Sequence, residues 1–232
     1  MKFSVVIANY NNGTFLGEAI ESVLRQDGAD FELIVCDAGS TDGSVAVINQ
    51  HSEDIAWWCS ESDGGQSEAF NKGFSHASGD VLTWLNADDI MMPGTLKAVR
   101  RALESHKYAD WATGNFLRFR QDDKTIIEAK WGPHILPCWL QGNGFPLQVF
   151  GPTTFWRRSA YDEIGPIDEK LHYTMDTDYW QRLIVAGKNR FELIIAVGRS
   201  ACIVSRKPLN LENIVGQRRL LKKCAKNAST VY

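Results

Sequence analysis

The chain has 232 residues, of which 44% are hydrophobic and 23% are charged, and its formal net charge is −3. This length allows one large α/β domain or two small ones, and the composition is that of a folded soluble protein. The slightly negative charge argues against a general nucleic-acid binder. The charge is uneven, because residues 206–232 carry seven Lys and Arg residues and one acidic residue, Glu212.

The five cysteines are an odd number and show no C-x-x-C spacing, which fits reduced thiols better than disulfides or a zinc site. Met1 and Lys2 lead directly into a strand pattern, so we expect no signal peptide. No apolar run approaches the length needed to cross a bilayer. We therefore expect a cytoplasmic protein, which could also lie on the inner face of the cell membrane.

The first 90 residues alternate between strand and helix patterns. Apolar, β-branched runs predict strands over residues 3–8, 31–36, 55–59 and 81–85. Helical periodicity predicts helices over residues 15–26, 45–50 and 68–77, the first of them capped by Thr14. Alternation of this kind favours parallel strands joined by right-handed crossovers, so the predicted fold class is α/β.

The second half of the chain is less regular. A helix is predicted over residues 95–105, and a hairpin over residues 115–120 and 125–130 that turns at residues 121–123. Residues 131–150 read as an irregular loop. Further along, the pattern predicts a helix within residues 173–186, one or two strands within residues 194–205, and an amphipathic helix over residues 211–226.

Polar residues follow several predicted strands, and the carboxyl edge of an open α/β sheet is where such folds hold ligands. These residues are Asn9, Tyr10, Asp37, Asp63, Asn86, Asp88 and Asp89. The adjacent acids Asp88 and Asp89 require a compensating charge, because unpaired buried charge is costly. A divalent cation that also binds phosphates would supply that charge. Because the chain has neither G-x-G-x-x-G after its first strand nor a P-loop, the hypothesis is a base pocket plus a metal-bridged diphosphate.

Five segments, in order, give the chain a resemblance to a known family. They read SVVIANYNN, ELIVCDAGSTDGS, SESDGGQSEAFNKGFSHASGDVLTWLNADD, FWRRSAYDEIGPIDEKL and MDTDYWQRL. With these segments, residues 1–183 resemble a family 2 glycosyltransferase of the GT-A fold, in the bacterial branch that builds O-antigen and other surface polysaccharides. The resemblance implies a Rossmann-like three-layer αβα sandwich around a mainly parallel sheet.

The resemblance also implies a role for each matching residue on the donor side. Tyr10 and Asp37 would hold the base and ribose of the donor nucleotide, with Asn9 where the family often has Thr. Asp63 and Lys72 would lie beside the nucleotide and its phosphates.

The resemblance further implies the residues of the chemical step. Asn86 takes the first position of the family's Asp-x-Asp motif, and Asp88 would bind Mg²⁺ or Mn²⁺. Asp176 would be the catalytic base of an inverting displacement. A sugar hydroxyl is a weak nucleophile that needs a positioned carboxylate, and a divalent cation stabilises the leaving diphosphate. Asp88 and Asp176 must therefore converge on one sugar-sized cleft.

Two departures from the family pattern bear on the metal. Asn86 replaces an acid, so charge at the metal is lower and Asp89 is expected to contribute more than usual. Where the family often has a late His, this chain has Ser205, Arg206 and Lys207. Either these basic residues hold the diphosphate or the metal binds weakly.

The sequence thus predicts an inverting, metal-dependent hexosyltransferase that uses a nucleotide-diphosphate sugar, with UDP expected, and a glycan or lipid-linked acceptor in bacterial polysaccharide biosynthesis. We expect one catalytic domain over residues 1–205, with a donor-binding half (1–90) and an acceptor-binding half (91–205). Residues 206–232 would form a basic helix that is either solvated or attracted to anionic lipid.

Two other functions remain open. One is a catalytically silent module that retains the nucleotide-sugar pocket; the presence of Asp88 and Asp176 argues against it, while Asn86 and the missing late His favour it. The other is a sugar-nucleotide pyrophosphorylase, which would show a Gly-rich, Arg-containing loop after the first strand. Residues 9–13 do not look like such a loop.

Overall fold

The computed structural model describes residues 1–119, 126–130, 151–192 and 202–205. In chain order, its elements are β1 (Lys2–Asn9), α1 (Gly13–Leu24), β2 (Asp30–Asp37), α2 (Ser44–Gln50), β3 (Trp57–Ser60), α3 (Gln66–His76), β4 (Val81–Asn86), β5 (Asp89–Met91), α4 (Thr95–Ser105), β6 (Trp111–Thr113), β7 (Asn115–Phe119), β8 (Ile126–Lys130), the 3₁₀ turn η1 (Gly151–Thr153), β9 (Thr154–Arg157), α6 (Arg158–Ile164), α7 (Met175–Val185), β10 (Arg190–Glu192) and β11 (Cys202–Ser205).

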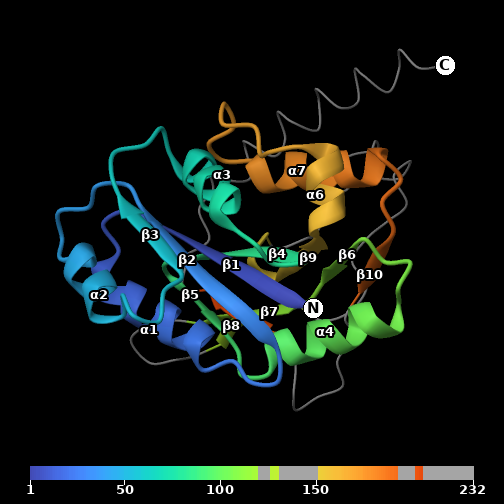
Figure 1. The fold of residues 1–232 in the computed structure, drawn as a ribbon, viewed down its shortest axis with the longest axis horizontal. Coiled ribbons are helices and arrows are strands. Elements are labelled where there is room, and N and C mark those ends of the chain that lie inside the picture. Colours follow the sequence, from blue (N-terminus) through green and yellow to red (C-terminus); the bar gives the residue numbers. More distant parts are fainter. Residues whose placement is uncertain (120–125, 131–150, 193–201, 206–232) are drawn as a thin grey trace.

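The main sheet has seven strands in the order β10-β6-β9-β4-β1-β2-β3 (Figure 1). Strands β4, β1, β2 and β3 run parallel to one another, as does the pair β10 and β6. Only β9 is antiparallel to its neighbours, β4 and β6. The sheet is therefore mainly parallel, as the alternation of strands and helices predicts.

Helices cover both faces of this sheet because β1 is apolar on both of its sides. Phe3, Val5 and Ile7 pack into one hydrophobic cluster, together with the buried faces of α1, α2 and α4. Val6 and Ala8 pack into the other, with residues of α3, α6 and α7. Figure 1 shows α3, α6 and α7 on one side of the sheet and α1, α2 and α4 on the other. This is the three-layer arrangement that the resemblance implies.

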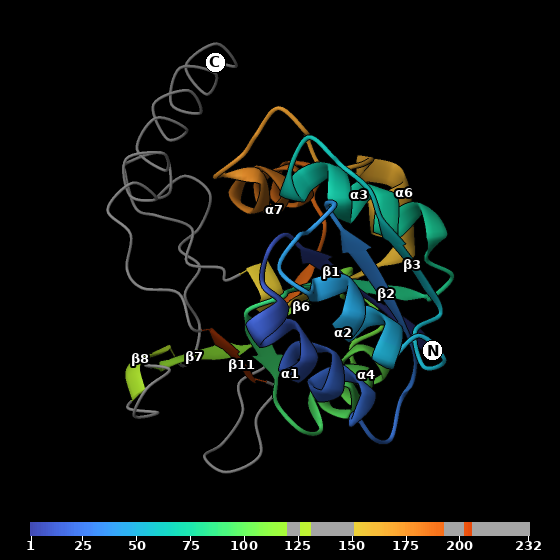
Figure 2. The same cartoon turned by 90° about the vertical axis from the view of Figure 1, so that its left-hand side faces the viewer.

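A second sheet stands apart from the first and has the order β5-β11-β7-β8 (Figure 2). The antiparallel pair β7 and β8 confirms the predicted hairpin, whose turn lies outside the described residues. Strand β11 pairs with β5, and this pairing sets Ser205 opposite Asp89. The second sheet therefore begins directly after the end of β4.

The aromatic side chains of the second cluster join the two halves of the chain. Trp84 of β4 lies with its ring centroid 5.1 Å from that of Trp156 on β9 and 5.1 Å from that of Trp180 on α7. Trp111 of β6 stacks on Trp180 at 5.8 Å. All four indole side chains are almost fully buried. Residues from the first 90 positions and residues from the later part of the chain therefore share one core.

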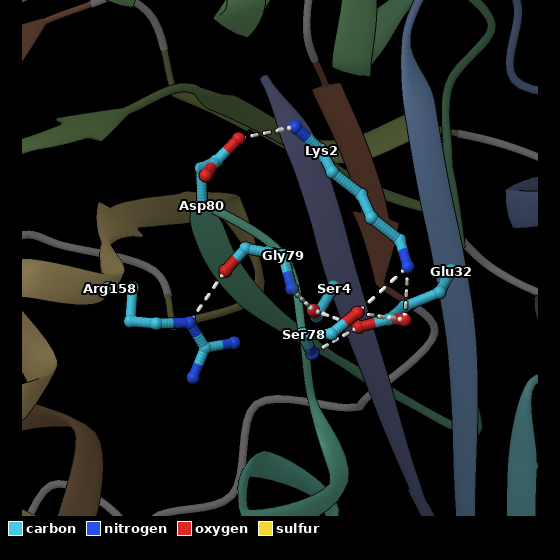
Figure 3. A network of polar contacts seen from close by, with 7 residues as sticks. All are labelled: Lys2, Ser4, Glu32, Ser78, Gly79, Asp80 and Arg158. Carbon is cyan, nitrogen blue, oxygen red and sulfur yellow. Dashed lines mark hydrogen bonds and ion pairs between the residues drawn. The ribbon is translucent and has the colours of Figure 1, made fainter.

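A polar network lies where β1 and β2 begin, away from their carboxyl ends (Figure 3). The Glu32 carboxylate accepts hydrogen bonds from Lys2 Nζ and Ser4 Oγ, each at 2.6 Å, and from the backbone N and hydroxyl of Ser78. Burial alone would raise the pKa of Glu32, but these hydrogen bonds outweigh it and lower the pKa to about 2.

Gly79 lets the segment before β4 approach β1 in this network. Its backbone N donates to Ser4 Oγ at 2.8 Å, and its carbonyl accepts from Arg158 Nε at 2.8 Å. A Cβ at this position would lie 2.7 Å from the backbone of Phe3 and Ser4. Only a glycine fits at this contact, because any side chain would clash with the backbone of β1.

The structure corrects several element boundaries. Helix α1 begins at Gly13 after Asn12, so the prediction that Thr14 caps this helix is wrong. Helix α3 begins two residues earlier than predicted, which brings Gln66 to its first turn. The sequence also gave no sign of β5, β9 or α6 as separate elements.

Three predictions fall outside the described residues: the irregular loop at 131–150, the basic helix at 211–226, and the arrangement of Arg206 and Lys207. Among the helices that the structure does describe, none has the length and apolar character to span a membrane.

Candidate active site

A cavity of about 590 Å³ opens at the carboxyl ends of β1 and β4 and at the start of α3. Five of the predicted site residues line it, namely Asn9, Tyr10, Asp63, Asn86 and Asp88. The parallel register explains why they meet, since Asn9 is paired with Asp37 across β1 and β2, and Ala8 with Asn86 across β1 and β4. Side chains from distant parts of the sequence thus reach one level of the sheet.

Asp37 lies at the end of β2 and is 1% exposed. Its Oδ1 accepts from Asn9 Nδ2 at 2.6 Å and Ser40 Oγ at 2.5 Å, while Oδ2 accepts from Ser60 Oγ at 2.6 Å and the Ser40 backbone N at 2.9 Å. Burial acts to raise the pKa of Asp37, but the hydrogen bonds from Ser40, Ser60 and Asn9 prevail and lower it. Asp37 is therefore a charged anchor for the strand ends, and it is not among the described residues that line the cavity.

Asn9 is 3% exposed and links Asp37 to the cavity wall. Its Oδ1 is buried and accepts no hydrogen bond from the described residues. Next to it, Tyr10 is 62% exposed at the cavity wall. An exposed aromatic ring in that place can stack on a nucleobase, an interaction of about 1–3 kcal/mol per base.

The turn after β1 is held by the loop after β2. Asn11 has a positive φ of 50°, its backbone N donates to Ser40 Oγ at 2.8 Å, and its Oδ1 accepts from the Thr41 backbone N at 2.9 Å. The Gly13 backbone N donates to Asp42 Oδ2 at 2.8 Å. These bonds hold Tyr10 and Asn12 at the cavity.

Asn86 ends β4 and its side-chain amide is held on both sides. Its Nδ2 donates to Asp89 Oδ2 at 2.6 Å, and its Oδ1 accepts from Gln66 Nε2 at 2.5 Å. Asp89 is 1% exposed on β5, so it lies behind the cavity wall and contacts Asn86 there. Asp88, between them in sequence, is partly exposed and lines the cavity itself.

Asp63 and Lys72 have different surroundings. Asp63 lines the cavity and accepts from the Gly65 backbone N at 2.9 Å, and burial raises its pKa. Lys72 Nζ lies 2.9 Å from Glu61 Oε1, and this hydrogen bond raises the pKa of the lysine. Lys72 therefore neutralises Glu61 near the cavity and is not among the described residues that line it.

Asp176 lies in the first turn of α7, where its Oδ1 accepts from the Thr177 backbone N at 2.6 Å. The start of α7 is fixed beside the start of α3, because Ser67 Oγ contacts the carbonyl of Leu171 and Met175 Sδ, both at 3.0 Å. Figures 1 and 2 both show α3 and α7 side by side. The structure thus brings Asp176 to the same end of the sheet as Asp88, although Asp176 is not among the described cavity-lining residues.

The side chains at the cavity that could ligate a metal suit a divalent cation that binds together with a diphosphate. Among the described residues, no group of three or more His, Cys, Asp or Glu side chains is placed to hold a metal ion. Mg²⁺ is usually held through one or two carboxylates together with substrate phosphates. Asp88 at the cavity suits that arrangement, whereas Asp89 and the Asn86 amide are engaged with each other.

Sequence reasoning missed three polar contributors to the site. Ser40 and Ser60 saturate Asp37, and Gln66 bonds Asn86. Gln66 stands inside a quoted family segment and three residues after Asp63, and that position was the available signal. Ser40 and Ser60 also stand in quoted family segments, and Ser60 ends β3, but nothing in the sequence shows that both reach Asp37.

The chain is similar to known proteins over most of its length. Residues 4–165 match the family described as Glycosyl transferase family 2. An uncharacterized glycosyltransferase of Nostoc sp. is 35% identical over 185 residues, which are 72% of this chain and 54% of that protein. The chain thus spans little more than half the length of that relative.

Two solved structures share the fold. TarS of S. aureus in complex with UDP-GlcNAc superposes with a TM-score of 0.68 at 18% identity, over 92% of this chain and 61% of that one. The mannosyltransferase PcManGT of Pyrobaculum calidifontis, in complex with GDP-Man and Mn²⁺, gives a TM-score of 0.64 at 17% identity, over 90% of this chain and 58% of that one. The predicted GT-A fold is confirmed.

Proposed function

We propose, from the premise that the chain belongs to glycosyl transferase family 2, that it moves a hexose from a nucleoside diphosphate sugar to a hydroxyl group of an acceptor. The cavity at the ends of β1 and β4 carries this proposal, because it sets Tyr10, Asp63 and Asp88 around one space large enough for a sugar nucleotide. The UDP-GlcNAc and GDP-Man bound to the two structural relatives support a donor of this class.

The cavity suggests a division of roles. The Tyr10 ring stacks on the base, while Asp37 and Asn9 fix the strand ends beneath it. The diphosphate lies toward Asp88, where a bound Mg²⁺ or Mn²⁺ would supply charge stabilisation for the leaving group. The Mn²⁺ in the PcManGT complex supports a divalent ion here.

Asp176 is proposed as the general base. It takes the proton of the acceptor hydroxyl while that oxygen forms its bond to the anomeric carbon and the bond from this carbon to the diphosphate oxygen breaks. The nucleoside diphosphate leaves on the opposite side, so the anomeric configuration inverts. The placement of α7 beside α3 supports this role, because it brings Asp176 to the Asp88 end of the sheet.

We extend the proposal to the setting of the reaction. The acceptor is a glycan or a lipid-diphosphate-linked sugar of a bacterial surface polysaccharide. The seven Lys and Arg residues of 206–232 hold the protein at the anionic inner face of the membrane. Cosedimentation with vesicles that contain 30% phosphatidylserine tests this attachment. Binding that is unchanged when Arg218, Arg219, Lys222 and Lys223 are replaced by Gln would contradict it.

The activity is tested with the purified full chain and a donor panel of UDP-glucose, UDP-GlcNAc and GDP-mannose. Release of nucleoside diphosphate, with water as the acceptor of the hexose, is measured with Mn²⁺ and with EDTA. We expect turnover of at least one donor with Mn²⁺ and its loss in Asp88→Asn, while the exposed Asp54→Asn serves as the matched control. A protein that binds a donor but turns over none of them would be a silent binding module, and one that releases sugar 1-phosphate on addition of pyrophosphate would be a pyrophosphorylase.

A further inference from the structure

Three side chains form a hydrogen-bonded chain from the protein interior to the cavity wall. Asp89, which is 1% exposed, accepts from Asn86 Nδ2 at 2.6 Å. Asn86 Oδ1 in turn accepts from Gln66 Nε2 at 2.5 Å. Asn86 and Gln66 both line the cavity. The chain therefore ends at the surface that a ligand would contact.

The order of the three groups fixes the direction of both amides. A carboxylate only accepts, so Asn86 must turn its nitrogen toward Asp89 and its oxygen toward Gln66. That oxygen also only accepts, so Gln66 must turn its nitrogen toward Asn86. Oε1 of Gln66 is then the acceptor that remains, and it accepts no hydrogen bond from the described residues.

The position of Gln66 indicates which part of a donor it meets. Through Asn86 it is joined to the turn that carries Asp88, where the proposed diphosphate lies. Its neighbour Ser67 contacts Met175, which immediately precedes Asp176, the proposed base. The sugar that is transferred must lie between the diphosphate and the base, and Gln66 is linked to the first side through Asn86 and to the second through its neighbour Ser67.

The polarity of this amide also indicates the chemistry of its partner. A phosphate oxygen and a carbonyl oxygen are both acceptors, so Oε1 of Gln66 is a poor partner for the diphosphate. A sugar hydroxyl is a donor and suits it. A buried polar site that is built to bond one hydroxyl discriminates strongly against a ligand that lacks the group.

We propose that Gln66 is a donor-sugar recognition residue, whose Oε1 accepts a hydrogen bond from a hydroxyl of the sugar ring. Asn86 and Asp89 are positioning residues that hold the Gln66 amide in this direction. This inference rests on the proposed function, because it requires that the cavity takes a nucleoside diphosphate sugar.

The test separates the sugar from the nucleotide. Isothermal titration of the full chain measures affinity for UDP and UDP-GlcNAc, and for GDP and GDP-mannose, each with Mn²⁺. Gln66→Met keeps the length of the side chain and removes its acceptor. We expect it to weaken binding of the sugar nucleotide about tenfold, the equivalent of one hydrogen bond, and to leave the free nucleotide unchanged. Gln50→Met, at the exposed end of α2, is the matched control.

Deoxy donors identify the hydroxyl. For one deoxy analogue of the bound sugar, Gln66→Met should cause no further loss of affinity, because the hydroxyl that bonds Gln66 is already missing. If the Met variant unfolds, Gln66→Leu is measured in the same way, with circular dichroism as the check on folding.

The position of the amide is tested at Asn86. Asn86→Ala should weaken binding of the sugar nucleotide more than binding of the free nucleotide. In the double variant with Gln66→Met, the loss of binding free energy should be smaller than the sum of the two single losses.

If Gln66→Met loses the same affinity for the nucleotide and the sugar nucleotide, or loses affinity for neither, the inference is overturned while the proposed function stands. A wild-type chain that binds neither UDP, GDP nor their sugars overturns the proposed function, and the inference with it.

Discussion

The acidic residues at the carboxyl edge of the sheet differ in what surrounds each carboxylate. Four hydrogen bonds saturate Asp37 and lower its pKa, while burial raises the pKa of Asp63. Asp88 lines the cavity, and Asp89 is held behind it by Asn86. Among these residues, a bound ligand is expected to meet Asp63 and Asp88, while Asp37 and Asp89 shape the wall.

Asp176→Asn tests the proposed base. The change keeps the shape of the side chain and its place in α7 but removes the proton acceptor. A positioned base contributes about 10²–10⁴-fold in rate, so we expect kcat to fall by at least about 10²-fold with the affinity for UDP unchanged. Steady-state turnover and titration with UDP measure the two quantities. Wild-type turnover in this variant would show that another group takes the proton.

Glu32 gives a prediction for stability against pH. Its pKa of about 2 in the folded protein lies below the ordinary value of 4.5, so its ionised form stabilises the fold. This contribution is present above pH 4.5 and is lost as the pH falls from about 4.5 toward 2. Glu32→Gln should lower the free energy of unfolding at pH 7 by about 1.5–3 kcal/mol, the range for hydrogen bonds to a charged group.

Urea unfolding at pH 7 and at pH 3 checks this expectation. The difference between wild type and variant should shrink at the lower pH. A difference that stays constant over this range would mean that the carboxylate charge of Glu32 contributes nothing.

Residues at strand ends could be predicted because parallel strands bring their carboxyl ends to one edge. Asn9, Tyr10, Asp63, Asn86 and Asp88 reach the cavity for that reason. Hydrogen-bond partners that come from other strand ends and a loop, as for Asp37, or from a neighbouring helix, as Gln66 does for Asn86, could not be predicted, because they depend on how these elements pack.

At the level of elements, the position of α3 sets the position of one wall of the cavity. It packs against β1 and β2 at Gly73, where a Cβ would lie 2.3 Å from Val6 Cγ1 and 3.2 Å from Cys36 Sγ. The helix can approach the sheet this closely only without a side chain at that position. The first residues of α3, Gln66 and Ser67, are placed by the same approach.

Gly73→Ala should therefore push α3 away from the sheet. We expect a loss of about 1–3 kcal/mol in the free energy of unfolding, as for other overpacked cores, and weaker nucleotide binding. Gly17→Ala in α1 is the matched control, since its Cβ would meet Val47 at an ordinary 3.6 Å and alanine favours helix. Urea unfolding of both variants measures the effect. Equal stability of the two would show that α3 adjusts without cost.

The long elements could be predicted, whereas some of the shortest, among them β5 and β9, could not. Strands β1, β2 and β4 have six to eight residues and clear apolar runs. Strands β5 and β9 have three and four residues, too few to show a period, and they exist because neighbouring strands pair with them. Tertiary contacts also decide the start of α1, whose preceding turn is tied to the loop after β2.

At the level of the whole molecule, the shared aromatic core predicts how the chain unfolds. Trp84 belongs to residues 1–90, whereas Trp111, Trp156 and Trp180 belong to residues 91–205, and all four pack in one cluster. We expect residues 1–205 to unfold in one transition, with the same midpoint by tryptophan fluorescence and by circular dichroism. Trp180→Ala should lower the stability by about 3–5 kcal/mol in that single transition. Two separate transitions would show that the halves are independent domains.

Ligand binding should also act on the whole fold. Because the described residues offer Asp88 and no preformed metal cluster, Mn²⁺ alone should change the melting temperature little. UDP with Mn²⁺ at about 100 times its dissociation constant should stabilise the protein by about 2.7 kcal/mol, or about 5–10 °C. Asp88→Asn should remove the difference between UDP with Mn²⁺ and UDP with EDTA. A large shift with Mn²⁺ alone would indicate a metal site independent of the nucleotide.

The in-register pairing of β1 with β2 and β4 restricts how this protein can change over time. Alternate residues of β1 face opposite layers, so inserting or deleting one residue inside the strand would exchange the two apolar sets and carry Asn9 away from Asp37. New specificities can therefore arise by substitution at the last residue of each strand, or by lengthening the loop that follows it. A change in the length of β1 itself would disrupt both hydrophobic clusters.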